Sequence, residues 1–421
     1  MYKKTILKNG LRIITIPMKN TKTVSVLALI GTGSKYETKD INGISHFLEH
    51  MFFKGTKRYP TTLRIAERLD NIGGAYNAFT SKEFTGFWAK VGGKHLDLAM
   101  DWISDILLNS KFEEKEIKRE KGVIIEEFNM YLDNPMSYIG DLWEKLLYGD
   151  QPSGWLTLGE KKNILRFKKN DFLDYFRKHY LNKNIVICVA GNFDNKKTIK
   201  KIEKYFNKFR NEEVQEKLKT TENQKTPETL IHYKKTDQTH FCLGVKGYNL
   251  FDSEKYAQII LSTILGANMS SRLFTLIRER KGLCYYIKTS SDSSTDTGYL
   301  VTQAGIPHKN LEQVVRLIVR EYKKFKTKKI TEKELQKAKD YLKGSINLKL
   351  ESSDFQASFY SFEELLTNKI LTPEEKFAKL DKVSINDIQK VAQNIFKPEK
   401  LNLAIIGPHK NKLKLQSLLK I

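Results

Sequence analysis

The sequence lacks any apolar run long enough to span a membrane, and it is poor in cysteine. Its hydrophobic stretches fall well short of the roughly 18 consecutive apolar residues of a membrane-spanning helix. The 421 residues include only three cysteines, and none of them lies in a CxxC pair. These absences argue against a transmembrane segment and a disulfide framework, and they favour a reducing compartment.

The N-terminal residues also lack the apolar core of a signal peptide. The opening stretch, MYKKTILKNGLRIITIPMKN, holds basic residues but no continuous hydrophobic region. Two short runs around Asn9-Gly10 instead predict a pair of strands joined by a turn. We therefore expect the fold to begin almost at Met1. A bacterial cytoplasm is the expected location, with the mitochondrial matrix as second choice.

Acidic residues are scarce relative to basic ones. Lysine and arginine number 73 against 49 aspartates and glutamates, which gives a net charge of +24. The lysines are scattered along the whole chain, whereas a nucleic-acid binder usually concentrates its basic residues on one element. We therefore expect no nucleic-acid partner, and a steeply salt-dependent affinity for DNA or RNA would argue otherwise. The charge is compatible with acidic peptides or a membrane surface.

The sequence echoes itself at about half its length. KNDFLDYF at 169–176 resembles INDIQKVA at 385–392, and EEKEIKRE at 113–120 resembles TEKELQKA at 331–338. The strand-like segments ICVAGNF and LAIIGPH correspond in the same way. Because each half orders its strands and helices alike, we predict an α+β protein made of two homologous domains.

A polar segment separates the two copies. EEVQEKLKTTENQKTPETL is charged and poor in large apolar residues, as is typical of a linker. We place the first domain at 1–210, the linker at 211–230 and the second domain at 231–421. Each domain is long enough to bury a core of its own.

The first half contains the run HFLEH, residues 46–50, on an otherwise apolar helix. His46 and His50 are four residues apart, so both imidazoles lie on one face of the helix, one turn apart. Two imidazoles at this spacing can reach one zinc ion at about 2.0–2.1 Å. Glu49 lies beside them and is better placed to hold a water than to bind the metal. The order of residues matches the H-x-x-E-H pattern of the inverzincins.

A catalytic zinc needs a third protein ligand, and a second helix offers one. One face of EIKREKGVIIEEFNMYLD carries the stripe Ile117, Glu120, Ile124, Glu127 and Tyr131. Its apolar members predict that this face is buried, and a buried carboxylate is costly unless it is paired or metal-bound. Glu120 and Glu127 are therefore the candidates. Glu126 points about 100° away from Glu127 and is the weaker candidate.

The second half lacks these charged groups. It has YAQIILSTILG where the first half has the HFLEH helix, and GSI at 344–346 stands near the place of EEF at 126–128. If the fold itself needed the charges, both copies would keep them. We conclude that they are chemistry added to one copy of a shared scaffold.

With these motifs the sequence resembles the pitrilysin-type zinc metallopeptidases, in the branch of the mitochondrial processing peptidase and small bacterial peptidases. NGISHFLEHMFFKGT, followed by EKGVIIEEF, carries the resemblance, which extends over nearly the whole chain. It implies zinc as cofactor, with His46, His50 and Glu127 as ligands and Glu49 as general base. It also implies that Glu120 supports the site without binding the metal.

The resemblance further implies where a substrate binds. GGAYNAFTSKEFTGFWAKV matches the substrate strand of the family, an edge strand that pairs with an extended peptide through its backbone. The residues concerned are Asn77, Ala78, Phe79 and Thr80. In the second half, Arg278 and Tyr285 match a pair that contacts substrate and stabilises the tetrahedral intermediate. The plain alternatives are an ordinary sheet strand, a surface arginine and a core tyrosine.

Relatives of this length have two α/β-roll domains that form half of a clamshell and pair into a chamber. The resemblance therefore implies a zinc endopeptidase that hydrolyses peptides, or unfolded or targeting segments, inside a homodimer. A heterodimer with a degenerate paralogue stays open. QPSG at 151–154, followed by Trp155 and Leu156, departs from the HPLG that relatives often have and puts specificity near that loop in doubt. The alternative function is a non-catalytic scaffold or core subunit of a larger complex that retains the motif.

Overall fold

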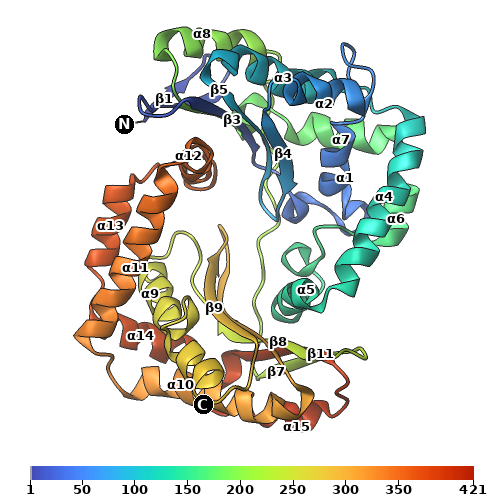
Figure 1. The fold of residues 1–421 in the computed structure, drawn as a ribbon. Coiled ribbons are helices and arrows are strands. Elements are labelled where there is room, and N and C mark those ends of the chain that lie inside the picture. Colours follow the sequence, from blue (N-terminus) through green and yellow to red (C-terminus); the bar gives the residue numbers. More distant parts are fainter. Residues whose placement is uncertain (1) are drawn as a thin grey trace. The chain divides into compact units, whose positions relative to one another are not determined.

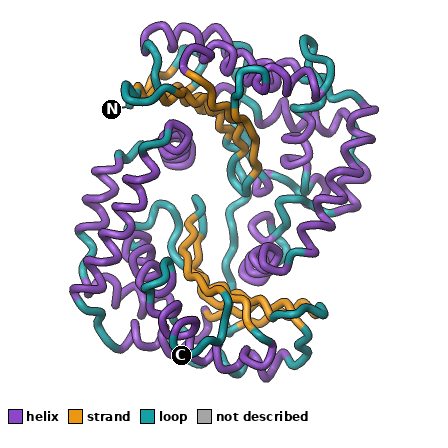
Figure 2. Tube along the Cα trace, in the orientation of Figure 1, coloured by secondary structure: helices purple, strands orange, loops and turns teal. Residues whose placement is uncertain are grey.

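The chain forms two compact units, each built around one β-sheet. The computed structural model describes residues 2–421. Unit 1 consists of Met1–Asn129, Trp155–Leu218 and Asn347–Leu371, and unit 2 consists of Met130–Gly154, Lys219–Ile346 and Thr372–Ile421. The strands gather in two groups, and helices pack beside each group (Figure 2). The predicted α+β fold is confirmed.

The sheet of unit 1 has six strands in the order β1-β2-β6-β3-β5-β4. The strands are β1 Lys3–Ile6, β2 Arg12–Pro17, β3 Thr23–Ile30, β4 Ala75–Thr80, β5 Thr85–Gly92 and β6 Ile185–Gly191. β2 and β6 run parallel, and all other neighbours run antiparallel. The central strands β3 and β6 are rich in Val, Ile and Leu and are buried over almost their whole length, as expected when both faces of a sheet are covered.

Helices cover the sheet of unit 1. They are α1 Ile44–Met51, α2 Thr62–Asp70, α3 Leu96–Asn109, α4 Glu114–Asp133, α6 Lys161–Arg166, α7 Lys169–His179, α8 Asn195–Phe206 and α12 Ser353–Thr367. The last turn of α4 belongs to unit 2. Aromatic rings pack among the aliphatic side chains of this core, including Phe47 of α1 and Phe172 of α7, whose centroids are 4.8 Å apart. This packing fixes α1 against the rest of unit 1.

The sheet of unit 2 has five strands in the order β7-β11-β8-β10-β9. The strands are β7 Glu228–Tyr233, β8 Thr239–Lys246, β9 Tyr286–Ser293, β10 Gly298–Ile306 and β11 Leu401–Gly407. The helices are α5 Pro135–Tyr148, α9 Lys255–Gly266, α10 Leu311–Thr327, α11 Glu332–Leu350, α13 Pro373–Asp381, α14 Ile385–Ile395 and α15 Lys412–Gln416. The last turn of α11 belongs to unit 1.

The two sheets share one strand order. β2-β6-β3-β5-β4 in unit 1 corresponds to β7-β11-β8-β10-β9 in unit 2, and in both sheets the first two of these strands form the parallel pair. β6 and β11 contain the segments ICVAG and LAIIG that resemble each other in sequence. This shared order supports the prediction that the halves are copies of one scaffold. Residues 211–227 form no helix or strand, and the last three residues of the predicted linker already belong to β7.

The compact units are not the continuous ranges 1–210 and 231–421 that the sequence predicts. Helix α5 comes from the first half but packs on β8 and β11 of unit 2, and α12 comes from the second half but packs on β3 and β6 of unit 1 (Figure 1). The pattern of a helix shows that it has an apolar face, but not which sheet that face meets. The prediction therefore missed the exchange of helices.

Buried contacts fix each exchanged helix. Trp143 of α5 is 1% exposed and packs in a cluster with Cys242 of β8. On α12, the fully buried Glu364 forms ion pairs with Lys4 at 2.7 Å and Arg12 at 3.5 Å, from β1 and β2. Each half therefore supplies a helix that covers the sheet of the other half.

Two features predicted from composition can be compared with the structure. Cys188, Cys242 and Cys284 are buried free thiols, in agreement with the predicted absence of disulfides. Within residues 2–421, no helix combines the length and the apolar character needed to cross a bilayer.

Candidate metal centre

Helix α1 places the HFLEH motif against the core of unit 1. The residues Ile44, Phe47, Leu48 and Met51 are all buried, which fixes the rotation of the helix about its axis. His46 and His50 therefore share the opposite side, with ring centroids 4.7 Å apart. The predicted one-turn spacing of the two imidazoles is observed.

A buried carboxylate holds the start of α1. Gly43 precedes the helix at φ +102°, and a Cβ there would lie 2.9 Å from the Cα of Gly159, so only glycine fits. Glu37 accepts hydrogen bonds from the backbone N–H groups of Gly43 and Ser45, both at 2.8 Å. Its negative charge stabilises the N-terminus of the helix, although burial raises the pKa of Glu37. The first turn of the histidine helix is thus anchored independently of any metal.

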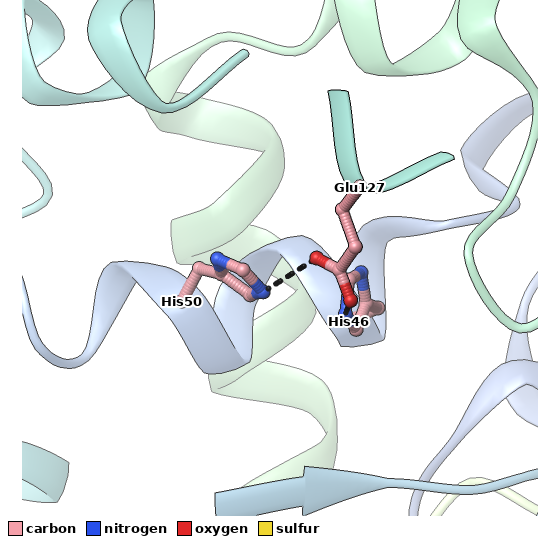
Figure 3. Close-up of side chains that lie close together, drawn as sticks. All are labelled: His46, His50 and Glu127. Carbon is pink, nitrogen blue, oxygen red and sulfur yellow. Dashed lines mark ion pairs between the residues drawn. The ribbon is translucent and has the colours of Figure 1, made fainter. Parts of the chain in front are cut away.

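Glu127 of α4 faces both histidines (Figure 3). One carboxylate oxygen lies 3.6 Å from Nε2 of His46, and the other lies 3.4 Å from Nε2 of His50. Each of the three side chains offers one ligand atom, and these three atoms all lie within 4.8 Å of one another. We call His46, His50 and Glu127 the His–Glu cluster. Within residues 2–421 no other group of three such side chains meets this criterion.

The apolar stripe of α4 determines which glutamate points inward. Ile117, Glu120 and Ile124 are buried, and Glu127 is half-buried on the same side. Glu126 is exposed, in agreement with its weaker ranking from the sequence. Burial of the stripe therefore brings two of the three candidate carboxylates toward α1.

Glu120 lies behind His50 rather than beside the other ligand atoms. One of its oxygens is 2.8 Å from Nδ1 of His50, and the other is 2.7 Å from the ammonium group of Lys54. A hydrogen bond on Nδ1 turns Nε2 of the same ring toward Glu127, which is the usual way in which proteins orient an imidazole ligand. Glu120 is 2% exposed. Its contacts match the supporting role that the resemblance implies.

The charged groups shift each other's protonation. Burial by itself lowers the pKa of His50, but contacts with Glu120 and Glu127 outweigh burial and raise the pKa to about 9. The imidazoles of His46 and His50 hold the pKa of Glu127 well below its ordinary value. In the metal-free protein the cluster therefore carries a proton at neutral pH, which a bound cation would replace.

Glu49 lies on α1 beside the cluster, and a side chain from β4 holds it. The hydroxyl of Thr80 donates a hydrogen bond of 2.5 Å to one carboxylate oxygen of Glu49. Burial raises the pKa of Glu49, and the bond from Thr80 partly offsets this effect. A half-buried carboxylate with one oxygen fixed and a raised pKa is suited to accept a proton.

Strand β4 lies at the edge of its sheet and contacts α1. It pairs with β5 on one side, and within the described part of the chain no strand pairs with its other side. The backbone at Asn77, Ala78 and Thr80 therefore lies on an edge strand of the sheet. The ring of Phe79 instead packs near Phe362 of α12, with centroids 6.3 Å apart, so its side chain is used for packing.

Arg278 and Tyr285 lie together on unit 2, whereas the His–Glu cluster lies on unit 1. Arg278 belongs to a π-helical turn, Phe274–Glu279, and its guanidinium lies 5.7 Å from the ring centre of Tyr285. Tyr285 is 76% exposed, so it is not the core residue that the plain alternative predicts. Wide π-helical turns of this kind occur often at functional sites.

The QPSG loop anchors the linker to unit 2. The side-chain amide of Gln151 accepts a hydrogen bond from the backbone N–H of Thr221 and donates one to its carbonyl, both at 2.9 Å. The hydroxyls of Ser153 and Thr220 also form a hydrogen bond. These contacts assign the loop a structural role, which the sequence left open.

Sequence reasoning missed two residues of the site, Glu37 and Lys54, and one contact of a third residue, Thr80. Glu37 caps α1, Lys54 contacts Glu120, and Thr80 contacts Glu49 through its side chain rather than only through its backbone. Of these contacts, only that of Lys54 could have been predicted from the sequence. Lys54 stands four residues after His50, so a continued helix would place it on the same side of α1. The other two contacts depend on packing between separate elements.

Comparison with known proteins agrees with this geometry. A family model described as "Insulinase (Peptidase family M16)" matches residues 12–157, and one described as "Peptidase M16 inactive domain" matches residues 166–342. A Bacillus subtilis protein named "Uncharacterized zinc protease YmxG" is 38% identical over 414 residues, which cover 98% of this chain and 99% of that protein. A Rickettsia felis protein with the name "Uncharacterized zinc protease" is 34% identical and covers 96% of this chain and 97% of its own length.

Solved structures share the fold over the full length. A protease from Helicobacter pylori superposes with a TM-score of 0.90 at 24% identity, covering 97% of this chain and 100% of that chain. The site lies in the part matched by the insulinase model, and the part without these charges is matched mainly by the inactive-domain model. The chain therefore belongs to the M16 family of zinc peptidases, the pitrilysin type that its sequence resembles.

Proposed function

We propose that this protein is a zinc-dependent endopeptidase whose catalytic centre is the His–Glu cluster with Glu49 beside it. The observation that carries the proposal is the meeting of three ligand atoms from α1 and α4 within 4.8 Å of one another. Two imidazoles and one carboxylate form a donor set found in catalytic zinc sites, which keep a fourth position open. His46, His50 and Glu127 are the proposed ligands.

The distances in the cluster support zinc over a simple ion pair. Two ligands of a tetrahedral zinc with bonds of about 2.0–2.1 Å lie roughly 3.3–3.4 Å apart. The contacts of Glu127 with His46 and His50 are 3.6 and 3.4 Å, close to that spacing. A charge-assisted hydrogen bond would be shorter, at about 2.7–2.9 Å.

Different residues of the site have different roles in the proposed hydrolysis. A zinc ion held by His46, His50 and Glu127 would supply Lewis-acid chemistry and would lower the pKa of a bound water to about 7. Glu49 takes the proton from the attacking water through the oxygen that Thr80 leaves free. Glu49 then passes the proton to the leaving amine. Thr80 keeps the carboxylate in one orientation through both transfers.

An extended peptide is the proposed substrate. It adds to the free edge of β4 at Asn77, Ala78, Phe79 and Thr80, so that backbone hydrogen bonds provide affinity with little demand on sequence. The hydrogen bond from Thr80 to Glu49 ties this strand to the proposed base. Peptides and unfolded or targeting segments therefore fit better than folded proteins.

Arg278 and Tyr285 are the proposed donors to the oxyanion of the tetrahedral intermediate. Their side chains lie together on unit 2, with Tyr285 largely exposed, which supports a joint role. We infer that they act from unit 2 of a partner chain in a homodimer that encloses the substrate in a chamber. A heterodimer with a degenerate paralogue would serve the same purpose. A bacterial cytoplasm remains the expected location.

The alternative function is a non-catalytic scaffold or core subunit of a larger complex, and one solved neighbour carries the name of a complex. A chain titled "Complex III2 from Candida albicans, Inz-5 bound" has a TM-score of 0.85 at 20% identity and covers 100% of both chains. The fold therefore also occurs in a large assembly. The complete cluster with Glu49 beside it favours the peptidase, and purification as a subunit of a larger complex without peptide cleavage would favour the scaffold.

Glu49→Gln tests the proposal. We expect the variant to keep zinc, because Glu49 is not a ligand, and to lose about 10²–10⁴-fold in cleavage of a quenched fluorescent peptide. Glu126→Gln is the matched control, since Glu126 is exposed one residue from Glu127, and it should keep both zinc and activity. Full activity in Glu49→Gln would refute the assigned base, and a zinc-loaded wild-type protein that cuts no peptide of a library would refute the peptidase.

A further inference from the structure

Lys54 follows helix α1 and lies about one helical turn beyond His50. The backbone N–H of Lys54 donates to the carbonyl of Met51 at 3.2 Å, which continues the helical direction. Gly55 then turns the chain at φ +133°, where a Cβ would lie 2.6 Å from the carbonyl oxygen of Pro60. The backbone thus fixes Lys54 on the side of α1 that faces α4.

The ammonium group of Lys54 contacts Glu120 and no other carboxylate within residues 2–421. The nitrogen lies 2.7 Å from one oxygen of Glu120, whose other oxygen lies 2.8 Å from Nδ1 of His50. The side chain of Glu120 is 3% exposed, and that of Lys54 is 21% exposed. A continuous row of contacts therefore runs from Lys54 through Glu120 to His50.

Lys54 carries a positive charge at the end of this row opposite His50. An imidazole that binds a metal is neutral, so His50 then offers Glu120 only the hydrogen bond of a neutral N–H. A buried carboxylate without a charged partner is costly and tends to rotate or take up a proton. Lys54 holds one oxygen of Glu120 so that the other oxygen stays directed at His50.

The two histidines differ in the support they receive. Nδ1 of His50 is held by Glu120, whereas Nδ1 of His46 is buried and has no hydrogen-bond partner in the described part of the chain. Orientation of the imidazole ligands by a hydrogen bond therefore depends on Glu120 alone, and Glu120 depends on Lys54. Loss of Lys54 should affect the metal more than its distance from the cluster suggests.

We propose that Lys54 is a positioning residue of the metal centre, which acts through Glu120 to hold the His50 imidazole in the ligand orientation. The inference rests on the zinc assignment made above, but not on the nature of the substrate. It adds a charged residue to the site that the ligand motif itself does not contain.

Lys54→Met tests this role, because methionine keeps much of the apolar stem and removes the charge. The zinc-loaded variant is mixed with a chromophoric chelator, and zinc release is followed without any peptide. We expect release about tenfold faster than in the wild type, within the roughly 10–100-fold range known for residues that orient metal ligands. Lys54→Arg should restore slow release. Lys57→Met, which changes an exposed lysine three residues on, should release zinc like the wild type.

A double substitution separates positioning from general destabilisation. If Lys54 acts through Glu120, adding Lys54→Met to Glu120→Gln should not speed zinc release any further. Circular dichroism of the metal-free variants shows whether they are folded. If Lys54→Met does not fold, Lys54→Gln replaces it in the same assay.

The outcomes decide the proposal independently of peptidase activity. Unchanged zinc release in folded Lys54→Met overturns it, and so does additive release in the double variant. Equal loss in Lys54→Arg and Lys54→Met also overturns it, since packing rather than charge would then matter. A wild-type protein that holds zinc but cuts no peptide refutes the endopeptidase and leaves the role of Lys54 standing. A wild-type protein that binds no zinc refutes both.

Discussion

Units 1 and 2 have the same strand order but bury different kinds of polar groups. In unit 1, helix α1 brings two histidines and a glutamate next to the carboxylates of α4. In unit 2, helix α9 buries Gln258 completely, and its amide donates to Ser291 at 2.7 Å and accepts from the backbone of Tyr248 at 3.2 Å. Neutral hydrogen bonds satisfy Gln258 of α9, so the helix at this place in the scaffold needs no buried charge.

Helices α4 and α11, which correspond in the two halves, differ in the same way. In the alignment of EEKEIKRE with TEKELQKA, Glu120 of α4 corresponds to Ala338 of α11. Ala338 is 3% exposed, and Glu120 is 2% exposed. A small apolar side chain therefore fills this position when no metal site is present. The buried carboxylate in unit 1 is a cost to the fold that its contacts with His50 and Lys54 offset.

The exchange of helices between the two units gives the first test of their comparison. Trp143→Ala on α5 should destabilise unit 2 by about 3–5 kcal/mol, the usual cost of emptying a buried aromatic site. Lys145→Ala on the exposed side of the same helix should cost less than about 0.5 kcal/mol. Guanidinium unfolding followed by circular dichroism measures both values. A fragment 231–421, which lacks α5, that still unfolds cooperatively would show that unit 2 does not need the exchanged helix.

The contrast between Glu127 and Glu126 of α4 gives the second test. Glu127→Gln should weaken zinc binding by at least about 100-fold, because it replaces a charged ligand by a neutral amide. Glu126→Gln should leave zinc affinity within about twofold, since this side chain is exposed. Competition with a zinc chelator measures both affinities. Similar losses in the two variants would mean that α4 has a different rotation when zinc is bound.

The protonation of His50 gives the third and smallest effect. Because the pKa of metal-free His50 is raised to about 9, the imidazole carries a proton at neutral pH, and zinc must displace it. Zinc affinity should therefore rise about tenfold for each pH unit up to about 9 and level off above it. Affinities measured at pH 6, 7 and 8 check the slope, with ligand-independent zinc hydrolysis corrected by a chelator reference. A flat profile would show that His50 is neutral before zinc binds.

The same shift has a consequence for the metal-free protein. The folded pKa of His50 lies above its ordinary value of about 6.5. Its contribution to stability is therefore complete below about pH 6.5 and is lost as the pH rises through about 9. Unit 2 has no equivalent cluster, so this pH dependence belongs to unit 1.

Much of the site could be predicted from local sequence. The spacing of His46 and His50 determines that they share one side of α1, and the apolar stripe of α4 separates Glu127 from Glu126. The strand order of the two sheets was not itself predicted, although its agreement between the units fits the echo between the halves. These predictions succeed because helix and strand periodicity act over a few residues and depend little on the rest of the chain.

Contacts between distant elements could not be predicted in this way. The bond from Thr80 to Glu49 joins the end of an edge strand to a helix, and Glu37 caps the same helix from the irregular segment that precedes it. The exchange of α5 and α12 between the compact units could not be predicted for the same reason, because these helices carry no local mark of the sheet that they cover. Burial of an apolar face is non-directional, so several partners satisfy it equally well until the chain is packed.

The sequence by itself determined which half carries the histidines and glutamates of the candidate metal centre, and on which side of each helix they lie. Only the tertiary structure decided that Glu127 of α4 lies next to the two histidines of α1. It also decided that Lys54 contacts Glu120 behind His50, and that each half supplies a helix to the compact unit of the other half. Periodicity fixes direction within one element, whereas distances between elements come from the packing of the whole core.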